Sequence, residues 1–343
     1  MTEPRPKPVL AITMGDPAGI GPEIVLKALA HGSVVERCRP LVIGDRRILE
    51  RAMGWDGVPT VKFRPFATTD QLPAGSAMGA GGIALMDLAN ADPADCIVGT
   101  VSAPSGRAAV ETVQRACDLC MNGVADAMVT APLNKDAMNQ AGFDYAGHTE
   151  LLANRTGAKK VTMLLVGPGL RVVHVSTHVA LEEAVRRVRQ ERVTEVIDLA
   201  YRGCRALGIA APRIAVAGLN PHAGESGLFG DQEAREIMPA VIAARSRGLD
   251  VSDPQPPDTV FLRATRGAYD IVVAMYHDQG HIPMKLLAFD EGVNVSLGLP
   301  IIRTSVDHGT AFDIAGTGKA RESSLLAAID VALQMIASRR MSE

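Results

Sequence analysis

Short runs of apolar residues recur along the chain and alternate with segments whose apolar residues follow a helical spacing. The runs lie at 9–12, 40–43, 127–129, 161–166, 171–175, 214–217 and 271–275. A helix predicted over 191–207 gathers six apolar side chains on one face: Val193, Val196, Ile197, Ala200, Cys204 and Leu207. A similar pattern at 323–338 predicts a C-terminal helix. Strands alternating with helices predict an α/β fold with a largely parallel sheet.

Composition narrows the class of protein. A length of 343 residues predicts about two domains. The 35 Lys and Arg nearly balance the 38 Asp and Glu, which argues against nucleic-acid binding driven by phosphate neutralisation. No apolar run approaches the roughly 18 residues that span a bilayer, and none fits a signal peptide. The five cysteines, an odd number, favour a reducing compartment, so we expect a cytoplasmic protein that binds no membrane.

Three of the eight histidines come just after predicted strands. His178 follows the run 171–175, His222 follows 214–217, and His277 follows 271–275. Ligands of open α/β sheets bind at the carboxyl ends of the strands, so these three imidazoles could hold one divalent metal with an open coordination position. The alternative is three unrelated loop histidines, because their spacing matches no local zinc motif.

Two more histidines accompany them. His174 lies within a predicted strand and is expected to be a core residue. His281 is four residues from His277, the spacing of a metal-binding pair on a helix, but Gly280 and Pro283 argue against a helix there.

Two further segments are candidates for anion binding. The glycine-rich stretch 15–23 lies between a predicted strand and a predicted helix, where it is either a ligand-binding loop or a structural turn. Arg303 lies in a segment that has several glycines and polar residues and few apolar ones. There it could bind a carboxylate or phosphate through two hydrogen bonds, or form a structural ion pair. No GxGxxG occurs, which disfavours an ordinary Rossmann domain.

Six segments together resemble the 4-hydroxythreonine-4-phosphate dehydrogenase (PdxA) family, in order and over about residues 9–335. They are ITMGDPAGIGPEI (12–24), GHTELLA (147–153), STH (176–178), GLNPHAGESGLFG (218–230), YHDQGHIPMK (276–285) and GVNVSLGLPIIRTSVDHGTAFDIAGTGKA (292–320). The resemblance implies the two-domain fold of isocitrate and isopropylmalate dehydrogenases, with the active site in the interdomain cleft. One domain would comprise 1–140 and 305–343 with the cofactor loop. The other, 141–304, would carry the metal ligands and the dimer interface.

The resemblance also implies roles for individual residues. The implied metal ligands are His178, His222 and His277. The implied substrate-binding residues are His148, Thr149, Lys285, Asn294 and Arg303. Gly309, Thr310 and Asp313 would lie along the cofactor loop. Lys285 would donate or shuttle a proton or act as an electrostatic clamp, and Asp258 would orient the ligand histidines.

The implied activity is oxidation of a secondary hydroxyl of a small anionic substrate by NAD, with NADP as the alternative, followed by decarboxylation of the β-keto acid. Zinc or cobalt would suit the imidazoles, as would nickel, with magnesium a less natural choice. Family members are homodimers with a shared active site. His281 and the segment 312–315 resemble a paralogous branch that acts on 4-phospho-D-threonate or 4-phospho-D-erythronate. 4-Phosphohydroxythreonine, the substrate of the vitamin B6 branch, is the other phosphorylated candidate.

Three alternatives stay open. The first is an NAD-dependent dehydrogenase of a terephthalate-type cis-dihydrodiol, since Arg303 would serve a carboxylate nearly as well as a phosphate. The second is a non-catalytic sugar-phosphate-binding protein of the same fold. The third is a metal-dependent hydrolase or aldolase that uses the same histidines.

Overall fold

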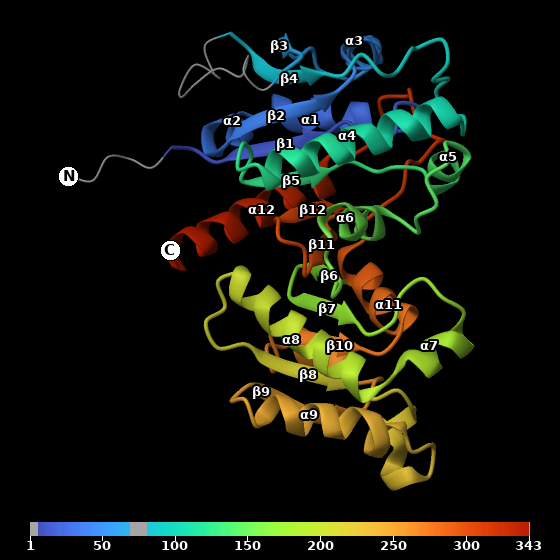
Figure 1. Ribbon diagram of the computed structural model, residues 1–343, viewed down its shortest axis with the longest axis vertical. Helices are drawn as coiled ribbons and strands as arrows, with labels where there is room; N and C mark the ends of the chain where they lie inside the picture. Colours follow the sequence, from blue (N-terminus) through green and yellow to red (C-terminus); the bar gives the residue numbers. More distant parts are fainter. Residues whose placement is uncertain (1–5, 69–80, 343) are drawn as a thin grey trace, which may run out of the picture. The chain divides into compact units, whose positions relative to one another are not determined.

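The computed structural model describes residues 6–68 and 81–342, and the chain divides into two units (Figure 1). The first unit consists of Met1–Ala158 and Pro300–Ile336, and the second of Lys159–Leu299 and Ala337–Glu343. These boundaries differ from the expected 140/141 and 304/305. The first lies later because α6 (His148–Thr156) packs on α4 (Ala103–Met121), where Arg155 forms a two-point ion pair with Asp118 at 2.8 and 2.6 Å.

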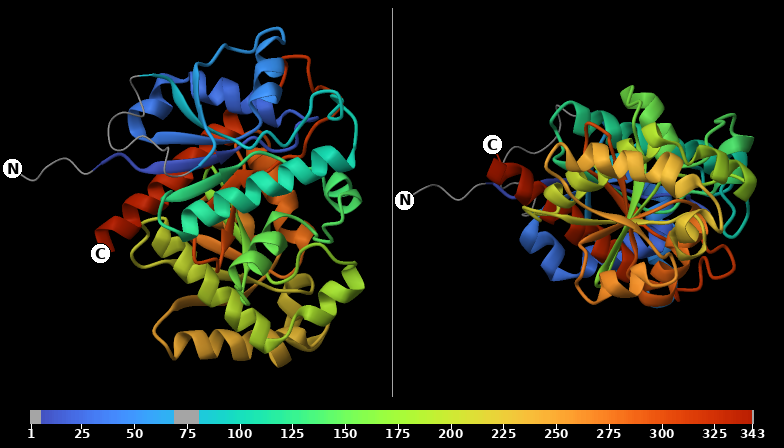
Figure 2. Two further views of the ribbon diagram at one scale, coloured as in Figure 1. Left: turned by 45° about the horizontal axis from the view of Figure 1, so that its top comes forward. Right: turned by 90° about the horizontal axis from the view of Figure 1, so that it is seen from below.

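The first unit is built on six parallel strands in the order β3-β4-β2-β1-β5-β12. They are β1 (Val9–Thr13), β2 (Arg39–Gly44), β3 (Phe63–Phe66), β4 (Ile83–Asp87), β5 (Ala127–Thr130) and β12 (Arg303–Val306). The other helices of this unit are α1 (Gly21–Ala30), α2 (Gly32–Arg37), α3 (Arg46–Met53), α5 (Lys135–Gln140) and the start of α12 (Ser323–Ser342). Every residue of β1, β5 and β12 is buried in a sheet covered on both faces (Figure 2). Continuous apolar runs predicted this for β1 and β5, whereas β12, with the sequence RTSV, was not among the predicted strands.

The second unit has six strands in the order β11-β6-β7-β10-β8-β9. They are β6 (Thr162–Gly167), β7 (Leu170–His174), β8 (Arg213–Ala217), β9 (Asp250–Gln255), β10 (Ile271–Ala274) and β11 (Val293–Leu297). β6 pairs antiparallel with both of its neighbours, whereas β7, β10, β8 and β9 are mutually parallel. The helices are α7 (Leu181–Arg187), α8 (Gln190–Ala206), α9 (Met238–Arg245), α10 (Val260–Thr265) and α11 (His277–Ala288). Two short helical segments, η3 (Pro221–Gly227) and η4 (Glu233–Ile237), follow β8.

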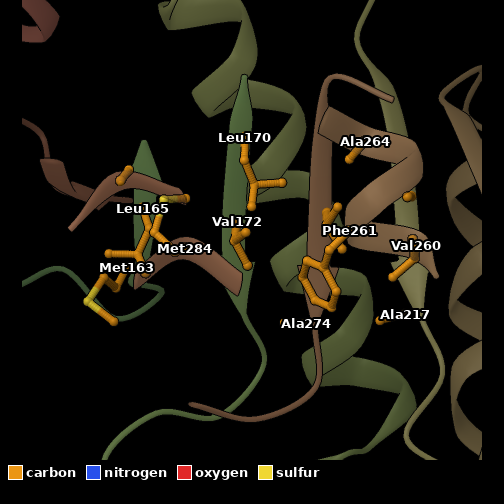
Figure 3. Close-up of a cluster of buried hydrophobic side chains, with 13 residues drawn as sticks. Met163, Leu165, Leu170, Val172, Ala217, Val260, Phe261, Ala264, Ala274 and Met284 are labelled. Carbon is orange, nitrogen blue, oxygen red and sulfur yellow. The ribbon is translucent and has the colours of Figure 1, made fainter. Parts of the chain in front are cut away.

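A buried cluster fixes α10 and α11 on the strands of the second unit (Figure 3). Met284 and Ala288 of α11 pack in the same cluster as Leu165 of β6 and Val172 of β7, and Phe261 of α10 lies on it as well. Since Met284 and Ala288 are one helical turn apart, they hold one face of α11 against the sheet. This contact sets the position of every other side chain on α11.

The mixed α/β class is confirmed, and so is the predicted helix at 191–207, now α8, with Val193, Val196 and Ile197 fully buried. The expectation against a helix after His277 was wrong. α11 continues through Gly280 and Pro283 because burial of one face outweighs the lost backbone hydrogen bond of an internal proline. Among the helices of the described residues, none combines the length and the hydropathy needed to cross a membrane.

Candidate functional site

In the first unit, the loop after β12 packs against the glycine-rich turn after β1. The backbone N–H of Ile20 donates to the carbonyl of Thr310 at 3.0 Å. A Cβ on Gly19 would lie 2.9 Å from the Thr310 Cβ, so only glycine allows this approach. Of the predicted cofactor residues, Thr310 is buried, whereas Gly309 and Asp313 are exposed on the same loop. The two segments meet at the carboxyl ends of parallel strands, where ligands of α/β sheets bind.

An ion pair on α1 anchors the far end of that loop. Lys27 Nζ donates to Glu23 Oε1 at 2.9 Å and to the carbonyls of Gly318 and Ala320 at 2.7 Å each. The same Glu23 oxygen accepts the Ala320 N–H at 2.8 Å. Sequence reasoning missed this clamp. Its only local signal is a Glu and a Lys four residues apart directly after the glycine-rich turn.

Asp16 is fully buried within the glycine-rich turn. Its Oδ1 accepts the Ala18 N–H at 2.8 Å, and its Oδ2 is buried with no hydrogen-bond partner among the described residues. Burial raises the pKa of this carboxyl to about 6. The backbone N–H groups of Ala18 and Asn134 lower the pKa, but by less than burial raises it. A carboxylate at neutral pH is therefore held at a cost beside the loop that carries Thr310.

Arg303, the first residue of β12, carries a buried positive charge. Its Nε and Nη2 donate to Thr130 Oγ1 at 3.2 and 2.7 Å, and its side chain is almost completely buried. Burial lowers the pKa of the guanidinium to about 9, while the charge of Glu150 raises it. Thr130 was missed from the sequence because 173 positions separate it from Arg303.

His148 lies beside this group at the start of α6, with Thr149 next to it. Burial, followed by the positive charges of Arg303 and Lys135, holds the pKa of His148 well below its usual range. Its Nε2 is buried with no hydrogen-bond partner among the described residues. A neutral imidazole that feels the positive charge of two cations is an arrangement that favours an incoming anion.

In the second unit, the three predicted metal-binding histidines follow three adjacent parallel strands. His178 comes after β7, His277 opens α11 directly after β10, and His222 lies in η3 after β8. The strand order β7-β10-β8 places all three segments at one edge of the sheet. This is the placement that the apolar runs predicted.

Two of the three imidazoles lie close together. The ring centres of His178 and His277 are 5.4 Å apart. His277 Nδ1 lies 2.7 Å from Asp278 Oδ1. Because the carboxylate can only accept, it fixes the proton on Nδ1 and leaves Nε2 available as a ligand. Asp278 was not singled out from the sequence, although it directly follows a predicted ligand.

His222 does not complete this pair within one chain. Its ring lies 6.0 Å from that of Phe229, and its backbone is left-handed, as are the next four residues of η3. Glu233 holds the segment by accepting the backbone N–H groups of Leu219 and Asn220 at 2.8 and 2.7 Å. Within the described ranges of a single chain, no three His, Cys, Asp or Glu side chains are arranged to hold a metal.

The remaining predicted residues of the second unit are dispersed. Lys285 lies on α11 with its Nζ 5.7 Å from the centre of the Phe289 ring. Asn294 on β11 donates to Met163 Sδ at 2.7 Å, and its Oδ1 is buried with no hydrogen-bond partner in the described part of the chain. Asp258 is exposed in the turn after β9. The geometry therefore supports a ligand role for His178 and His277 more directly than the orienting role expected of Asp258.

Comparison with known proteins identifies similar sequences and structures. Residues 36–332 match the family model described as pyridoxal phosphate biosynthetic protein PdxA. The D-threonate 4-phosphate dehydrogenase of Cupriavidus necator is 52% identical, covering 94% of this chain and 95% of the relative. The 4-hydroxythreonine-4-phosphate dehydrogenase of Desulfosudis oleivorans is 49% identical, covering 97% of both chains. A crystal structure of the 4-hydroxythreonine-4-phosphate dehydrogenase of Klebsiella pneumoniae is 45% identical and superposes with a TM-score of 0.85, covering 96% of this chain and 100% of the other.

Proposed function

Since the chain belongs to the PdxA family, we propose that it is a dehydrogenase that oxidises the secondary hydroxyl of a phosphorylated hydroxy acid. The substrates named for its relatives, D-threonate 4-phosphate and 4-hydroxythreonine-4-phosphate, are the first candidates. The observation that carries the proposal is the buried guanidinium of Arg303 beside the neutral imidazole of His148. A buried arginine presents donors in a fixed plane and matches a phosphate or carboxylate group.

In this proposal, Arg303 and His148 bind an anionic end of the substrate, with Thr149 and Asn294 as further contacts. Lys135 adds positive charge, and the low pKa of His148 keeps its ring neutral, so that it binds by hydrogen bonding. Lys285 takes up the proton that the substrate hydroxyl loses on oxidation, or donates the proton that the product carbon gains after decarboxylation.

We assign NAD, or NADP, to the loop that carries Gly309, Thr310 and Asp313. The contact of this loop with the glycine-rich turn supports this assignment, because it holds a loop with exposed residues, Gly309 and Asp313, at the carboxyl ends of β1 and β12. We assign a zinc, cobalt or magnesium ion to His178, His222 and His277. When bound, the nicotinamide accepts the hydride, and the divalent ion supplies positive charge that lowers the pKa of the substrate hydroxyl and favours decarboxylation of the keto acid.

We also propose that the working enzyme is a homodimer that shares this metal site. Only two of the three ligand imidazoles lie together in one chain, so a second copy is needed to complete the set. Beyond His277, Ile282 and Leu286 of α11 and the residue that caps it, Phe289, are exposed, with 59%, 82% and 71% of their surface accessible. These residues share one face of the helix, and an exposed apolar stripe of this kind is typical of a surface that another chain covers.

The first experiment is NADH formation by the metal-reconstituted protein on four substrates. These are 4-phospho-D-threonate, 4-phospho-D-erythronate, 4-phosphohydroxythreonine and a terephthalate cis-dihydrodiol. We expect turnover of at least one phosphorylated acid, with release of carbon dioxide and loss of activity on chelation. Turnover of the dihydrodiol alone would refute the phosphate assignment, and binding without turnover on all four would favour a sugar-phosphate-binding protein.

A mixing experiment tests the shared site. His178→Ala and His222→Ala are each expected to be inactive as homodimers. If the pair His178 and His277 of one chain works with His222 of the other, a heterodimer of the two variants keeps one intact site. Random association of equal amounts should then restore about one quarter of the parent activity. No recovery in verified heterodimers would refute the shared site.

Leu286→Glu tests the exposed face of α11 as the dimer interface. We expect this variant to be a monomer by size-exclusion chromatography with light scattering, and to be inactive.

A further inference from the structure

A fourth and a fifth imidazole lie next to the two neighbouring metal-ligand candidates. His174, the last residue of β7, is fully buried, and neither of its ring nitrogens has a well-aligned hydrogen-bond partner among the described residues. Burial, followed by the neighbouring histidines, holds the pKa of His174 well below its usual range, so the ring is neutral. Its Nε2 would lie 2.3 Å from a Cβ on residue 280, so Gly280 provides the space that the ring needs.

His281 joins His174 to His277. The rings of His281 and His277 are stacked, with centres 3.7 Å apart and planes inclined by 10°. His281 Nδ1 lies 3.0 Å from the backbone carbonyl of His277, and because a carbonyl can only accept, Nδ1 carries the proton. The centre of the His174 ring is 4.8 Å from that of His281 and 6.4 Å from that of His277.

We propose that His281, with His174 buried beside it, is a positioning residue that holds the imidazole of His277 in one orientation for metal binding. The proposal rests on the metal site of the proposed function. Asp278 fixes which nitrogen of His277 is protonated, but one hydrogen bond leaves the ring plane free to rotate. The stacked His281 ring removes that freedom, and the hydrogen bond to the His277 carbonyl fixes His281 itself.

The chemistry of the two residues argues against a role in packing alone. A buried imidazole without a well-aligned hydrogen bond costs more desolvation free energy than an apolar side chain of similar size. His174 accepts that cost, and Gly280 in the middle of a helix adds a loss of helix propensity. Both are explained if the two rings serve to support His277, because a flat aromatic ring against another restricts rotation in a way that a flexible aliphatic chain does not.

The test is zinc affinity, measured on the intact dimer by competition with a chromogenic chelator, for His281→Leu, His281→Phe and His174→Leu. We expect His281→Leu to weaken zinc binding about 10- to 100-fold, the usual effect of removing a group that orients a metal ligand. His281→Phe keeps the stacked ring and should retain affinity within a few-fold of the parent. The absorption bands of the cobalt-substituted dimer should shift in His281→Leu and stay in place in His281→Phe.

Two control variants separate the possible failures. His277→Ala should lose the zinc, and His31→Leu, which removes an imidazole of the first unit that pairs with Glu322, should bind zinc like the parent. If His277→Ala loses zinc while His281→Leu binds it as the parent does, the positioning role is wrong and the metal site stands. If the parent and His277→Ala bind zinc equally, both proposals fail. Should His281→Leu not fold as a dimer, parent-like zinc affinity in His174→Leu would overturn the proposal.

Discussion

Replacing Asp16 by Asn should change how the stability of the protein depends on pH. Burial raises the pKa of Asp16 from 3.8 to about 6, so the folded state binds a proton that the unfolded state has already released at pH 5. The free energy of unfolding is therefore not reduced by Asp16 well below pH 4, where the carboxyl is protonated in both states, and it falls as the pH rises toward 6. A shift of this size corresponds to about 3 kcal/mol of destabilisation at pH 7 and about 0.5 kcal/mol at pH 4.

Asp16→Asn removes the charge, so it abolishes the pH-dependent part of this cost. The new amide replaces an Oδ2 that has no hydrogen-bond partner among the described residues; any cost of burying it does not vary with pH and cancels when two pH values are compared. The assay is urea unfolding of parent and variant at pH 4 and pH 7. The difference in the free energy of unfolding, variant minus parent, should be about 2.5 kcal/mol larger at pH 7 than at pH 4, so the variant gains stability relative to the parent as the pH rises.

Asp45→Asn provides a matched control of opposite sign. Asp45 is also buried in the first unit, but it accepts from the Arg47 side chain and from the backbone N–H groups of Arg47 and Ala91. These bonds outweigh burial and lower its pKa, so its contribution to stability is present at neutral pH and is lost as the pH falls. Asp45→Asn should therefore be more destabilising at pH 7 than at pH 4. A pH-independent effect of Asp16→Asn, or the same sign for both variants, would refute the reasoning.

Two further substitutions test the first unit. In steady-state kinetics, Arg303→Lys should raise the KM for the anionic substrate by ~10-fold or more, because lysine lacks the planar pair of donors. The KM for NAD should stay nearly unchanged, and an equal rise in both constants would contradict a substrate-specific role. Lys27→Met should lower the free energy of unfolding by about 3 kcal/mol in urea titrations and raise the KM for NAD, because it leaves the buried Glu23 carboxylate without its cation. Adding Glu23→Gln to Lys27→Met should recover part of that stability, and a purely additive double variant would show that the pair is not coupled.

The sequence was sufficient to predict β1, β2, β5, β6, β7, β8 and β10 and the edge of the sheet at which the candidate ligand histidines lie, but not β3, β4, β9, β11 or β12. Apolar runs mark buried parallel strands, and polar side chains that follow them must emerge at the carboxyl edge, which is how His178, His222 and His277 were found. α8 was equally accessible, because its apolar residues repeat at helical spacing over 17 residues.

Other features depend on contacts that no local pattern encodes. α11 contains a glycine and a proline that argue against a helix, and it forms because Met284 and Ala288 are buried against strands distant in sequence. The bonds from Lys27 to the loop after β12 span more than 290 residues. The left-handed turn at His222 is equally hidden, because non-glycine residues adopt it only when a partner such as Glu233 holds the ends in place.

The discontinuous first unit has a consequence for biosynthesis. Its first strands leave the ribosome early. β12, however, begins only at residue 303, so until it is made β5 is paired with β1 on one side and has no strand on the other. At 5–20 residues per second, the wait from residue 158 to residue 336 is about 10–35 s. The second unit is nearly continuous in sequence and can form during that interval. The nascent chain thus carries an open strand edge for many seconds, during which it is a substrate for chaperones, and a product truncated before residue 303 would keep that edge permanently.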